Sequence, residues 1–163
     1  MEIKEVEKKE DIIKVSELAR IIWEEHFTKI IGSEQVDYML DKFLSLKAIE
    51  TCIKEENYRF FSLLEGREHI GFFSLRPDPD MLFLSKLYVR KECRGQGYST
   101  LAMKAIERIA KDSDYDTIWL TCNKYNANTL AIYEHFGFTI FKDEVSDIGN
   151  GYVMDDYFLK KQL

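Results

Sequence analysis

Residues 84–111 constrain this chain more than any other stretch, because they join a buried strand, a glycine-bearing turn and an amphipathic helix. The strand is an apolar run that ends at Val89, and the helix has an apolar stripe that begins at Leu101. Between them, Gly95 and Gly97 let the backbone approach a ligand without an intervening side chain. Backbone N–H groups at a helix start are unpaired, and with the helix dipole they favour an anion, especially a phosphate. The stretch therefore predicts a phosphate-binding turn.

Other phosphate-binding motifs fit this turn poorly. A dinucleotide-binding fingerprint needs a glycine three positions after Gly97, where the chain has Thr100. A P-loop needs the sequence Gly-Lys-Ser/Thr, which the turn lacks. Two glycines can also make an ordinary tight turn, so the turn taken alone leaves a structural and a ligand-binding interpretation open.

Length and composition limit the classes of protein to which the chain can belong. It has 163 residues, of which 45% are hydrophobic, enough for one domain with a core and few for two. The net charge of −6 argues against a general nucleic-acid binder, which usually presents a basic face. Its three cysteines are widely spaced, so neither a disulfide framework nor a metal site is expected. The sequence contains no apolar run typical of a signal peptide or membrane span, and we expect a cytoplasmic protein without a membrane partner.

The order of predicted elements indicates an α/β (α+β) fold in a single domain over residues 1–163. β-branched and aromatic runs predict strands at 2–6, 58–64, 69–75, 81–89, 117–122, 138–142 and 152–159. Helical spacing predicts helices after Asp11, after Ser33, at 48–54, after the glycine turn and at 126–136. Gly32 and Ser33 separate the first two helices, and we expect the Ser33 side chain to cap the second. This order predicts a mixed sheet with helices packed on it.

A second cluster, residues 121–138, places an Asn at a strand end and a Tyr two turns into the next helix. Together the two clusters resemble the GCN5-related N-acetyltransferase (GNAT) superfamily. The acetyl-CoA loop of that family reads R/Q-x-x-G-x-G/A, matched here by Arg94, Gly97 and Ser99. Its later motif reads N-x-x-A-x-x-x-Y-E-x-x-G-F, matched here by Asn126, Tyr133, Glu134, Gly137 and Phe138. Ser99 stands where the family usually has Gly or Ala, and Thr129 stands where Ala is usual. Neither departure removes a group that the chemistry needs.

The resemblance implies a mostly antiparallel GNAT sheet flanked by helices. It also implies an acetyltransferase that moves an acetyl group from acetyl-CoA to a primary amine by direct transfer in a ternary complex, without a metal. In this family, the strand before the loop pairs with the pantetheine arm, and the loop holds the pyrophosphate. The implied cofactor-binding residues are Leu87, Tyr88, Val89, Arg94, Gly95, Gln96, Gly97, Tyr98, Ser99, Thr100 and Asn126. Residues 34–40 and 147–157 resemble a bacterial subgroup that includes PaiA-type spermidine/spermine N-acetyltransferases.

Tyr133 is the catalytic residue that the resemblance implies. A phenol with a pKa near 10 stays protonated at neutral pH, so it can give a proton to the departing thiolate. Helical spacing alone also fits a core tyrosine with a satisfied hydroxyl, and the match around Asn126 favours the catalytic role. The attacking amine, with a pKa of about 10.4, is neutral in only about one molecule in a few thousand at pH 7. The sequence leaves the base that it needs open among Glu24, Glu25, His26 and Asp156.

The amine acceptor is also open at this stage. Acidic residues would suit a polyamine such as spermidine or spermine, and the candidates are Glu24, Glu25, Asp37, Asp155 and Asp156. A protein N-terminus, an amino sugar or an antibiotic are alternatives, and a non-catalytic acyl-CoA-binding or regulatory module is the alternative from another class. A covalent acetyl-cysteine route through Cys93 or Cys122 has no support in the sequence. The family often forms dimers through its C-terminal strands, so a homodimer is expected here.

Overall fold

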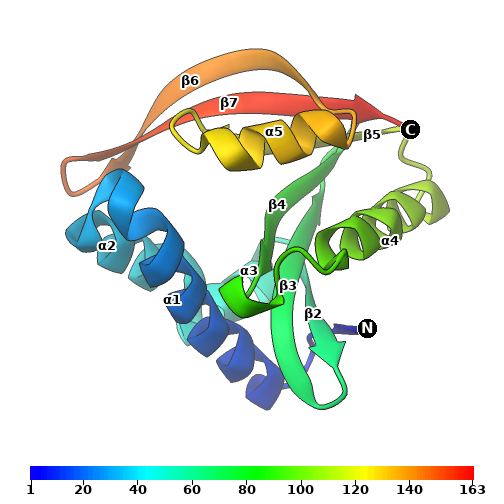
Figure 1. The fold of residues 1–163 in the computed structure, drawn as a ribbon, viewed down its shortest axis with the longest axis horizontal. Helices are drawn as coiled ribbons and strands as arrows, with labels where there is room; N and C mark the ends of the chain where they lie inside the picture. Colours follow the sequence, from blue (N-terminus) through cyan, green and yellow to red (C-terminus); the bar gives the residue numbers. More distant parts are fainter. The chain divides into compact units, whose positions relative to one another are not determined.

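The computed structural model describes residues 1–163, and its element order is that of an α+β fold (Figure 1). The chain divides into two compact units. The first unit comprises residues 1–77 and 84–106, and the second comprises residues 78–83 and 107–163. Strand β4 (Leu82–Val89) contributes residues to both units. The single domain over residues 1–163 therefore stays a prediction.

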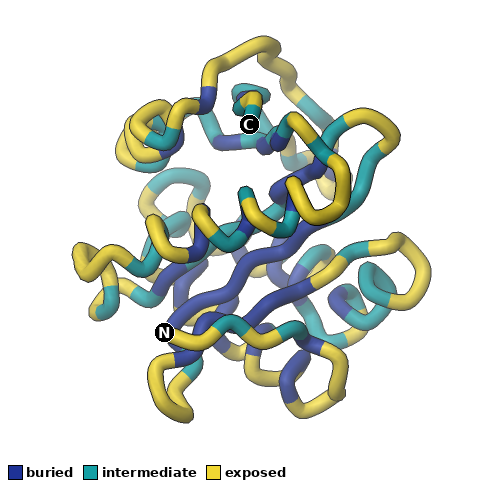
Figure 2. Tube along the Cα trace, turned by 90° about the vertical axis from the view of Figure 1, so that its right-hand side faces the viewer, coloured by how far each residue is buried: buried dark blue, intermediate teal, exposed yellow.

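The first unit contains a sheet, and three consecutive helices come between its first and second strands. Its elements are β1 (Glu2–Glu5), α1 (Lys9–Ile31), α2 (Ser33–Leu44), α3 (Leu46–Glu55), β2 (Arg59–Glu65), β3 (Glu68–Pro77), the end of β4, the short 3-10 helix η1 (Lys91–Cys93) and the start of α4 (Tyr98–Asp112). Strands β1, β2 and β3 pair in antiparallel fashion, and β4 follows β3 in the sheet. Most residues of β2 and β3 are buried, in agreement with their predicted apolar runs (Figure 2).

The first two helices show what the local sequence predicts and what it does not. The apolar stripe of α1 is buried, including Val15, Leu18 and Ile22, as its helical spacing predicts. The capping prediction for Ser33 is wrong, because α2 begins at Ser33 itself and Gly32 takes the N-cap position without a side-chain bond. Ser45 has the capping role for α3, where its hydroxyl accepts a hydrogen bond from the Ala48 N–H at 3.2 Å.

The second unit is built around a long hairpin. Its elements are the end of α4, β5 (Thr117–Asn123), α5 (Ala127–His135), β6 (Thr139–Gly149) and β7 (Tyr152–Gln162). Strand β7 pairs in antiparallel fashion with both β5 and β6. Leu82 and Phe83, at the start of β4, pair with β5 in parallel, so the strand order is β1-β2-β3-β4-β5-β7-β6. The predicted mixed, mostly antiparallel sheet flanked by helices is confirmed.

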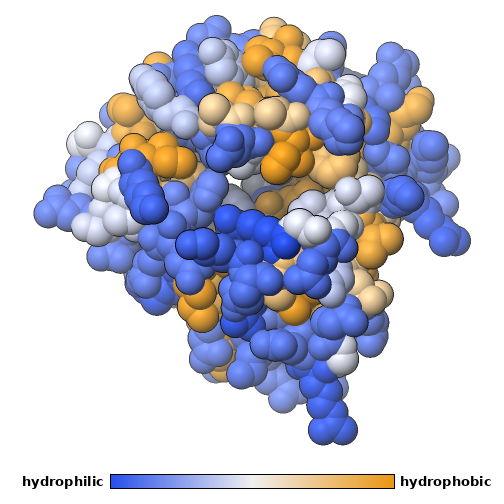
Figure 3. Space-filling model, viewed as in Figure 1, coloured by the Kyte–Doolittle hydropathy of each residue, from blue (hydrophilic) through white to orange (hydrophobic).

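Strand β6 is longer than the sequence predicts. The predicted strand ends at Lys142, whereas β6 extends to Gly149. Nearly all its residues are exposed, so its sequence lacks the alternation of buried and solvated residues that marks a half-covered strand. The face drawn in Figure 3 is largely hydrophilic with separate apolar patches, as expected for a chain of which 32% is charged. None of the helices is long and hydrophobic enough to cross a lipid bilayer.

Candidate active site

The glycine turn, residues 94–100, lies in the first unit and joins η1 to α4. Its two glycines have left-handed backbones, with φ of 75° at Gly95 and 82° at Gly97. No atom lies within 4 Å of the position that a Cβ would take at either glycine. Glycine is therefore required at these positions by the left-handed φ angles and not by a lack of space for a side chain. The backbone at Gly95 and Gly97 is exposed to solvent, where a ligand can reach it.

The start of α4 presents unpaired N–H groups. The first helical bond runs from the Leu101 N–H to the Gly97 carbonyl oxygen at 3.0 Å, so the three preceding N–H groups have no acceptor within the helix. They belong to the predicted residues Tyr98, Ser99 and Thr100. The Tyr98 hydroxyl bonds to Glu65, and burial with the nearby Glu65 charge raises the pKa of that phenol. The predicted phosphate contacts thus share one helix end.

Arg94 and β4 fix how the chain enters this turn. The Arg94 Nε donates to the Val89 carbonyl oxygen at 3.0 Å, and the Gln96 side-chain amide donates to the Glu92 carbonyl oxygen at 3.3 Å. Just after β4, the Arg90 N–H donates to the Ile70 carbonyl oxygen of β3 at 2.8 Å.

The backbone of β4 alternates between its two neighbours. A Cβ on Gly71 would collide with the Tyr88 carbonyl oxygen, so the polar backbone groups of Tyr88 point at β3. Because direction alternates along a strand, those of Leu87 and Val89 point away from β3. Among the three predicted strand residues, Leu87 and Val89 have the orientation suited to pairing with a ligand, and Tyr88 does not.

In the second unit, Tyr133 lies in a buried cluster with Cys122 and Asp156. Their exposed fractions are 9%, 6% and 7%. The Tyr133 ring packs edge-on against Phe138, with centroids 5.6 Å apart. Burial, with a smaller contribution from Cys122, raises the pKa of the Tyr133 phenol well above its usual value. The phenol therefore remains protonated at any physiological pH.

Asp156 differs from the other candidate bases by its environment. Burial and the adjacent Asp155 charge raise the pKa of Asp156 to about 6, while Lys124 acts in the opposite direction. A carboxyl with this pKa is mostly ionised at pH 7 and can still accept a proton. Glu24 and Glu25 are exposed on α1, and His26 is half-buried beside Phe27.

Several predicted acidic residues are already paired with cations. The Lys124 Nζ lies 2.9 Å from Asp155 and 2.8 Å from Asp143. On the first unit, Arg20 lies 3.2 Å from Glu24 and 3.6 Å from Asp37. These pairs reduce the acidic charge that a polyamine would meet.

Asn126 occupies the N-cap position of α5 and is 6% exposed. Its carbonyl oxygen accepts a bond from the Leu130 N–H at 3.0 Å, and its own N–H donates to the Asn123 carbonyl oxygen at 3.0 Å. The Asn123 side chain accepts a bond from the Tyr125 N–H at 2.9 Å, which shapes the turn between β5 and α5. Asn126 thus lies in the turn between β5 and α5, three residues after the strand ends.

Lys86 and Lys124 are two charged residues that are not among the site residues predicted from the sequence. Lys86 belongs to β4 and is surrounded by side chains of the first unit, and Lys124 bridges two aspartates of the second. The one signal for Lys86 is a charge in an otherwise apolar strand. Lys124 gave no signal, because its partners are far away in the sequence.

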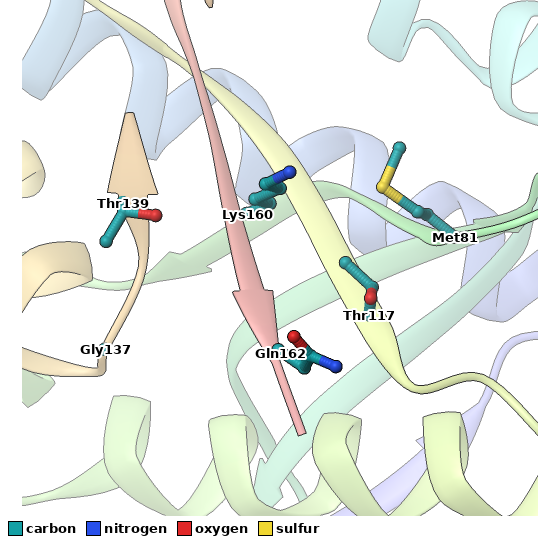
Figure 4. A pocket seen from close by; sticks show the side chains of 6 residues that line it. All are labelled: Met81, Thr117, Gly137, Thr139, Lys160 and Gln162. Atoms are coloured by element: carbon teal, nitrogen blue, oxygen red, sulfur yellow. The ribbon is translucent and has the colours of Figure 1, made fainter. Parts of the chain in front are cut away.

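A pocket of about 410 Å³ lies elsewhere in the second unit (Figure 4). It is lined by Met81, Thr117, Gly137, Thr139, Lys160 and Gln162. None of these is a predicted site residue, so the pocket is separate from the residues described above. No group of three or more His, Cys, Asp or Glu residues is placed to hold a metal ion.

Comparisons with known proteins agree with this fold and these motifs. The model of the acetyltransferase (GNAT) family matches residues 15–138, and the chain therefore belongs to that family. No curated protein matches the chain by sequence. The prediction of an acetyltransferase enzyme that uses acetyl-CoA is confirmed at the level of the family.

Three solved structures with a similar fold are distant in sequence. A PaiA N-acetyltransferase from Thermoplasma acidophilum, crystallised with coenzyme A, has a TM-score of 0.81 at 19% identity, covering 100% of both chains. A GNAT acetyltransferase from Elizabethkingia anophelis with acetyl-CoA bound has a TM-score of 0.61 at 20% identity, covering 73% of this chain and 84% of that one. A ribosomal-protein-alanine N-acetyltransferase from Brucella melitensis has a TM-score of 0.73 at 15% identity, covering 100% of both chains.

Proposed function

We propose that this protein transfers the acetyl group of acetyl-CoA to a primary amine. The observation that carries the proposal is the left-handed pair Gly95 and Gly97, which opens the first turn of α4 beside exposed N–H groups. Such a helix start favours a diphosphate. The residues proposed to hold the cofactor are those predicted from the motifs, with Leu87 and Val89 favoured over Tyr88 on β4.

Tyr133 acts as the acid in this proposal. When the amine attacks the thioester carbonyl, the carbon–sulfur bond breaks and coenzyme A leaves as a thiolate. A phenol that is held protonated can supply the proton that this sulfur needs. The raised pKa of Tyr133 keeps the phenol protonated and argues against a base.

Asp156 is the proposed base. It removes the proton that a primary amine must lose before or during attack, because at pH 7 that amine is almost entirely protonated. Its raised pKa of about 6 lies closer to neutral pH than that of an ordinary aspartate. Its location on β7, in a cluster that includes Cys122 and Tyr133, also supports the assignment.

Direct transfer is favoured over an acetyl-cysteine intermediate. Burial raises the pKa of Cys122 to about 12 and that of Cys52 to about 11. Burial and the Glu92 charge also raise the pKa of Cys93. Because the thiolate is the nucleophilic form, all three cysteines are poorly activated at neutral pH.

A polyamine acceptor is the narrower proposal. The PaiA enzyme has a similar fold, and Asp156 offers a carboxylate to a cationic chain. Neutralising Asp156 should then raise KM for spermidine more than KM for a monoamine of similar length. Equal changes would remove the polyamine from the proposal, and turnover of an N-terminal alanine peptide instead would favour a protein acceptor. A cytoplasmic location and a homodimer through β6 and β7 also remain proposals.

One experiment tests the whole scheme. Purified protein is titrated with coenzyme A by calorimetry and then assayed for thiol release with acetyl-CoA and a panel of amines. Binding together with amine-dependent thiol release supports the enzyme. Binding without release for any amine would favour the acyl-CoA-binding module, and absence of binding would contradict the proposal altogether.

A further inference from the structure

Asn150 and Gly151 form the turn that joins β6 to β7 (Figure 1). Gly149 and Tyr152 pair across the hairpin, so Asn150 and Gly151 are the two central residues of the turn. Both have left-handed backbones, with φ of 55° at Asn150 and 77° at Gly151. Two successive left-handed residues are typical of a type I′ turn, for which Asn-Gly is a preferred sequence. The sequence and the backbone therefore agree on a two-residue hairpin turn.

The polar groups at the centre of this turn have no partner in the protein. Neither the Asn150 side-chain amide nor the Gly151 N–H takes part in a hydrogen bond, and both residues are exposed. The neighbouring Gly149 N–H, by contrast, donates to the Asp147 carboxylate at 2.7 Å. The Gly151 nitrogen and the Asn150 amide carbon are therefore two groups, close in the chain, that neither burial nor hydrogen bonding protects.

Asn57 has the same backbone conformation in a different setting. It is also exposed and left-handed, with φ of 60°. The residue after it is Tyr58, whose N–H donates to the Cys52 carbonyl oxygen at 3.0 Å. For the Tyr58 nitrogen to react, this hydrogen bond must break, at a cost of about 1 kcal/mol, and a bulky side chain must move. The chain therefore contains two similar asparagines that differ in the residue that follows.

We propose that Asn150 is a site of spontaneous deamidation. The Gly151 nitrogen gives its proton to solvent hydroxide and attacks Cγ, the amide carbon of the Asn150 side chain. The Cγ–Nδ2 bond breaks, ammonia leaves with a proton from water, and a cyclic imide remains. Water then adds to one of the two imide carbonyls and opens the ring. A carboxylate thus replaces the amide, with water as the co-reactant and no change of oxidation state.

The two ways of opening the imide change the hairpin differently. Hydrolysis at the side-chain carbonyl gives an aspartate, which keeps the length of the turn and adds a negative charge. Hydrolysis at the backbone carbonyl gives an isoaspartate, in which the chain runs through the side chain and gains a methylene. Because turn length fixes the register of a hairpin, the isoaspartate should loosen the Gly149–Tyr152 and Asp147–Val153 pairs. Nearly all of β6 is exposed, so few buried contacts oppose this loosening.

The test is incubation of the folded protein in heavy-oxygen water at pH 8, followed by peptide mass spectrometry over several days. Uptake of the oxygen label shows that conversion took place during the incubation. The peptides that contain Asn150 and Asn57 are compared in the same sample. We expect Asn150 to convert at least about tenfold faster than Asn57, because the Gly151 nitrogen has no hydrogen bond to break and no side chain beside it.

Two variants and an exchange measurement identify the site and its effect on the hairpin. Asn150→Gly should lose the labelled peptide and keep the hairpin, because Gly-Gly also favours a type I′ turn. Asn57→Gly should leave labelling at residue 150 unchanged. In the isoaspartate fraction of the wild-type protein, amide hydrogen exchange should be faster at Tyr152 and Val153 and unchanged in the β2–β3 hairpin.

Equal conversion at Asn150 and Asn57 would overturn the inference, since the unbonded nitrogen and the glycine would then have no effect. It would also be wrong if Asn150 stayed intact while a synthetic peptide of residues 147–153 was converted, because the folded turn would then protect the amide. Isoaspartate at residue 150 without faster exchange would contradict the expected loss of pairing. These readouts need neither coenzyme A nor an amine, so the proposed function and this inference can fail separately.

Discussion

The glycine turn and the Tyr133 cluster prepare for chemistry in opposite ways. The turn is exposed and presents backbone N–H groups, whose positions depend on the left-handed angles of Gly95 and Gly97. The cluster is buried and presents side chains, whose pKa values are shifted by desolvation. Binding a diphosphate needs hydrogen-bond donors that a ligand can reach, whereas proton transfer needs titratable side chains that are held away from water. Mutations in the turn should therefore change affinity for the cofactor, and mutations in the cluster should change turnover and its pH dependence.

The largest effect is expected at Tyr133. The Tyr133→Phe variant removes the proposed proton donor, and kcat should fall by about 10²-fold or more. Affinity for coenzyme A, measured by calorimetry, should change little because the ring remains. Tyr125→Phe, at an exposed tyrosine just before α5, is the matched control and should keep full turnover. Equal kcat for wild type and Tyr133→Phe would remove the phenol from the mechanism.

Asp156→Asn should lower turnover and stabilise the fold. The pKa of Asp156 is raised in the folded state, so the stability that its protonated form gives is present below pH 4 and is lost as pH rises through about 6. A shift of about two units corresponds to about 3 kcal/mol. Thermal unfolding should therefore show the variant more stable than wild type at pH 8 and nearly equal at pH 4. Asp155→Asn removes an ion pair to Lys124 and should give no gain at pH 8.

Gly97→Val should weaken coenzyme A binding. A β-branched residue at φ of 82° costs about 1–2 kcal/mol, so the turn should relax and the dissociation constant should rise about 5- to 30-fold. Gly66→Val is the control, since Gly66 also has a left-handed backbone, with φ of 61°, in the β2–β3 hairpin. That variant should lose a similar stability and keep its affinity. Unchanged affinity in Gly97→Val would place the diphosphate elsewhere.

Arg94→Gln should have the smallest effect. It removes the hydrogen bond from the Arg94 guanidinium to the Val89 carbonyl oxygen, worth about 1 kcal/mol, and coenzyme A affinity should fall about fivefold. Arg108→Gln, which removes an exposed pair with Asp112 on α4, should leave affinity unchanged. A larger loss in Arg108→Gln would mean that general positive charge, rather than the entry of the chain into the turn, supports binding.

The sequence predicts the turn well because the requirement there is local. A left-handed backbone at two positions calls for glycine, and the following apolar stripe marks the helix that they introduce. The motif around Asn126 and Tyr133 is similarly compact. The family assignment and the mixed sheet follow from these two segments and from the order of the strands.

The burial of Asp156 and Lys86 cannot be predicted from local sequence motifs. Asp156 is one of several acidic residues in the sequence, and only packing around β7 removes it from water. Lys86 depends on Tyr58 and Phe60, which lie more than twenty positions earlier. The length of β6 escaped prediction for a related reason, since a strand exposed on both sides has no hydrophobic period to detect.

The close approach of β3 to β4 has a practical consequence for any mutational survey. At Gly71 the obstacle to a side chain is the backbone oxygen of Tyr88, and neither rotamer changes nor smaller neighbours can relieve it. In a library that samples all amino acids at this position, glycine alone should survive selection for folded protein. The fraction of non-glycine variants that survive at residue 71 thus measures how stringently the selection removes misfolded protein, independently of catalysis.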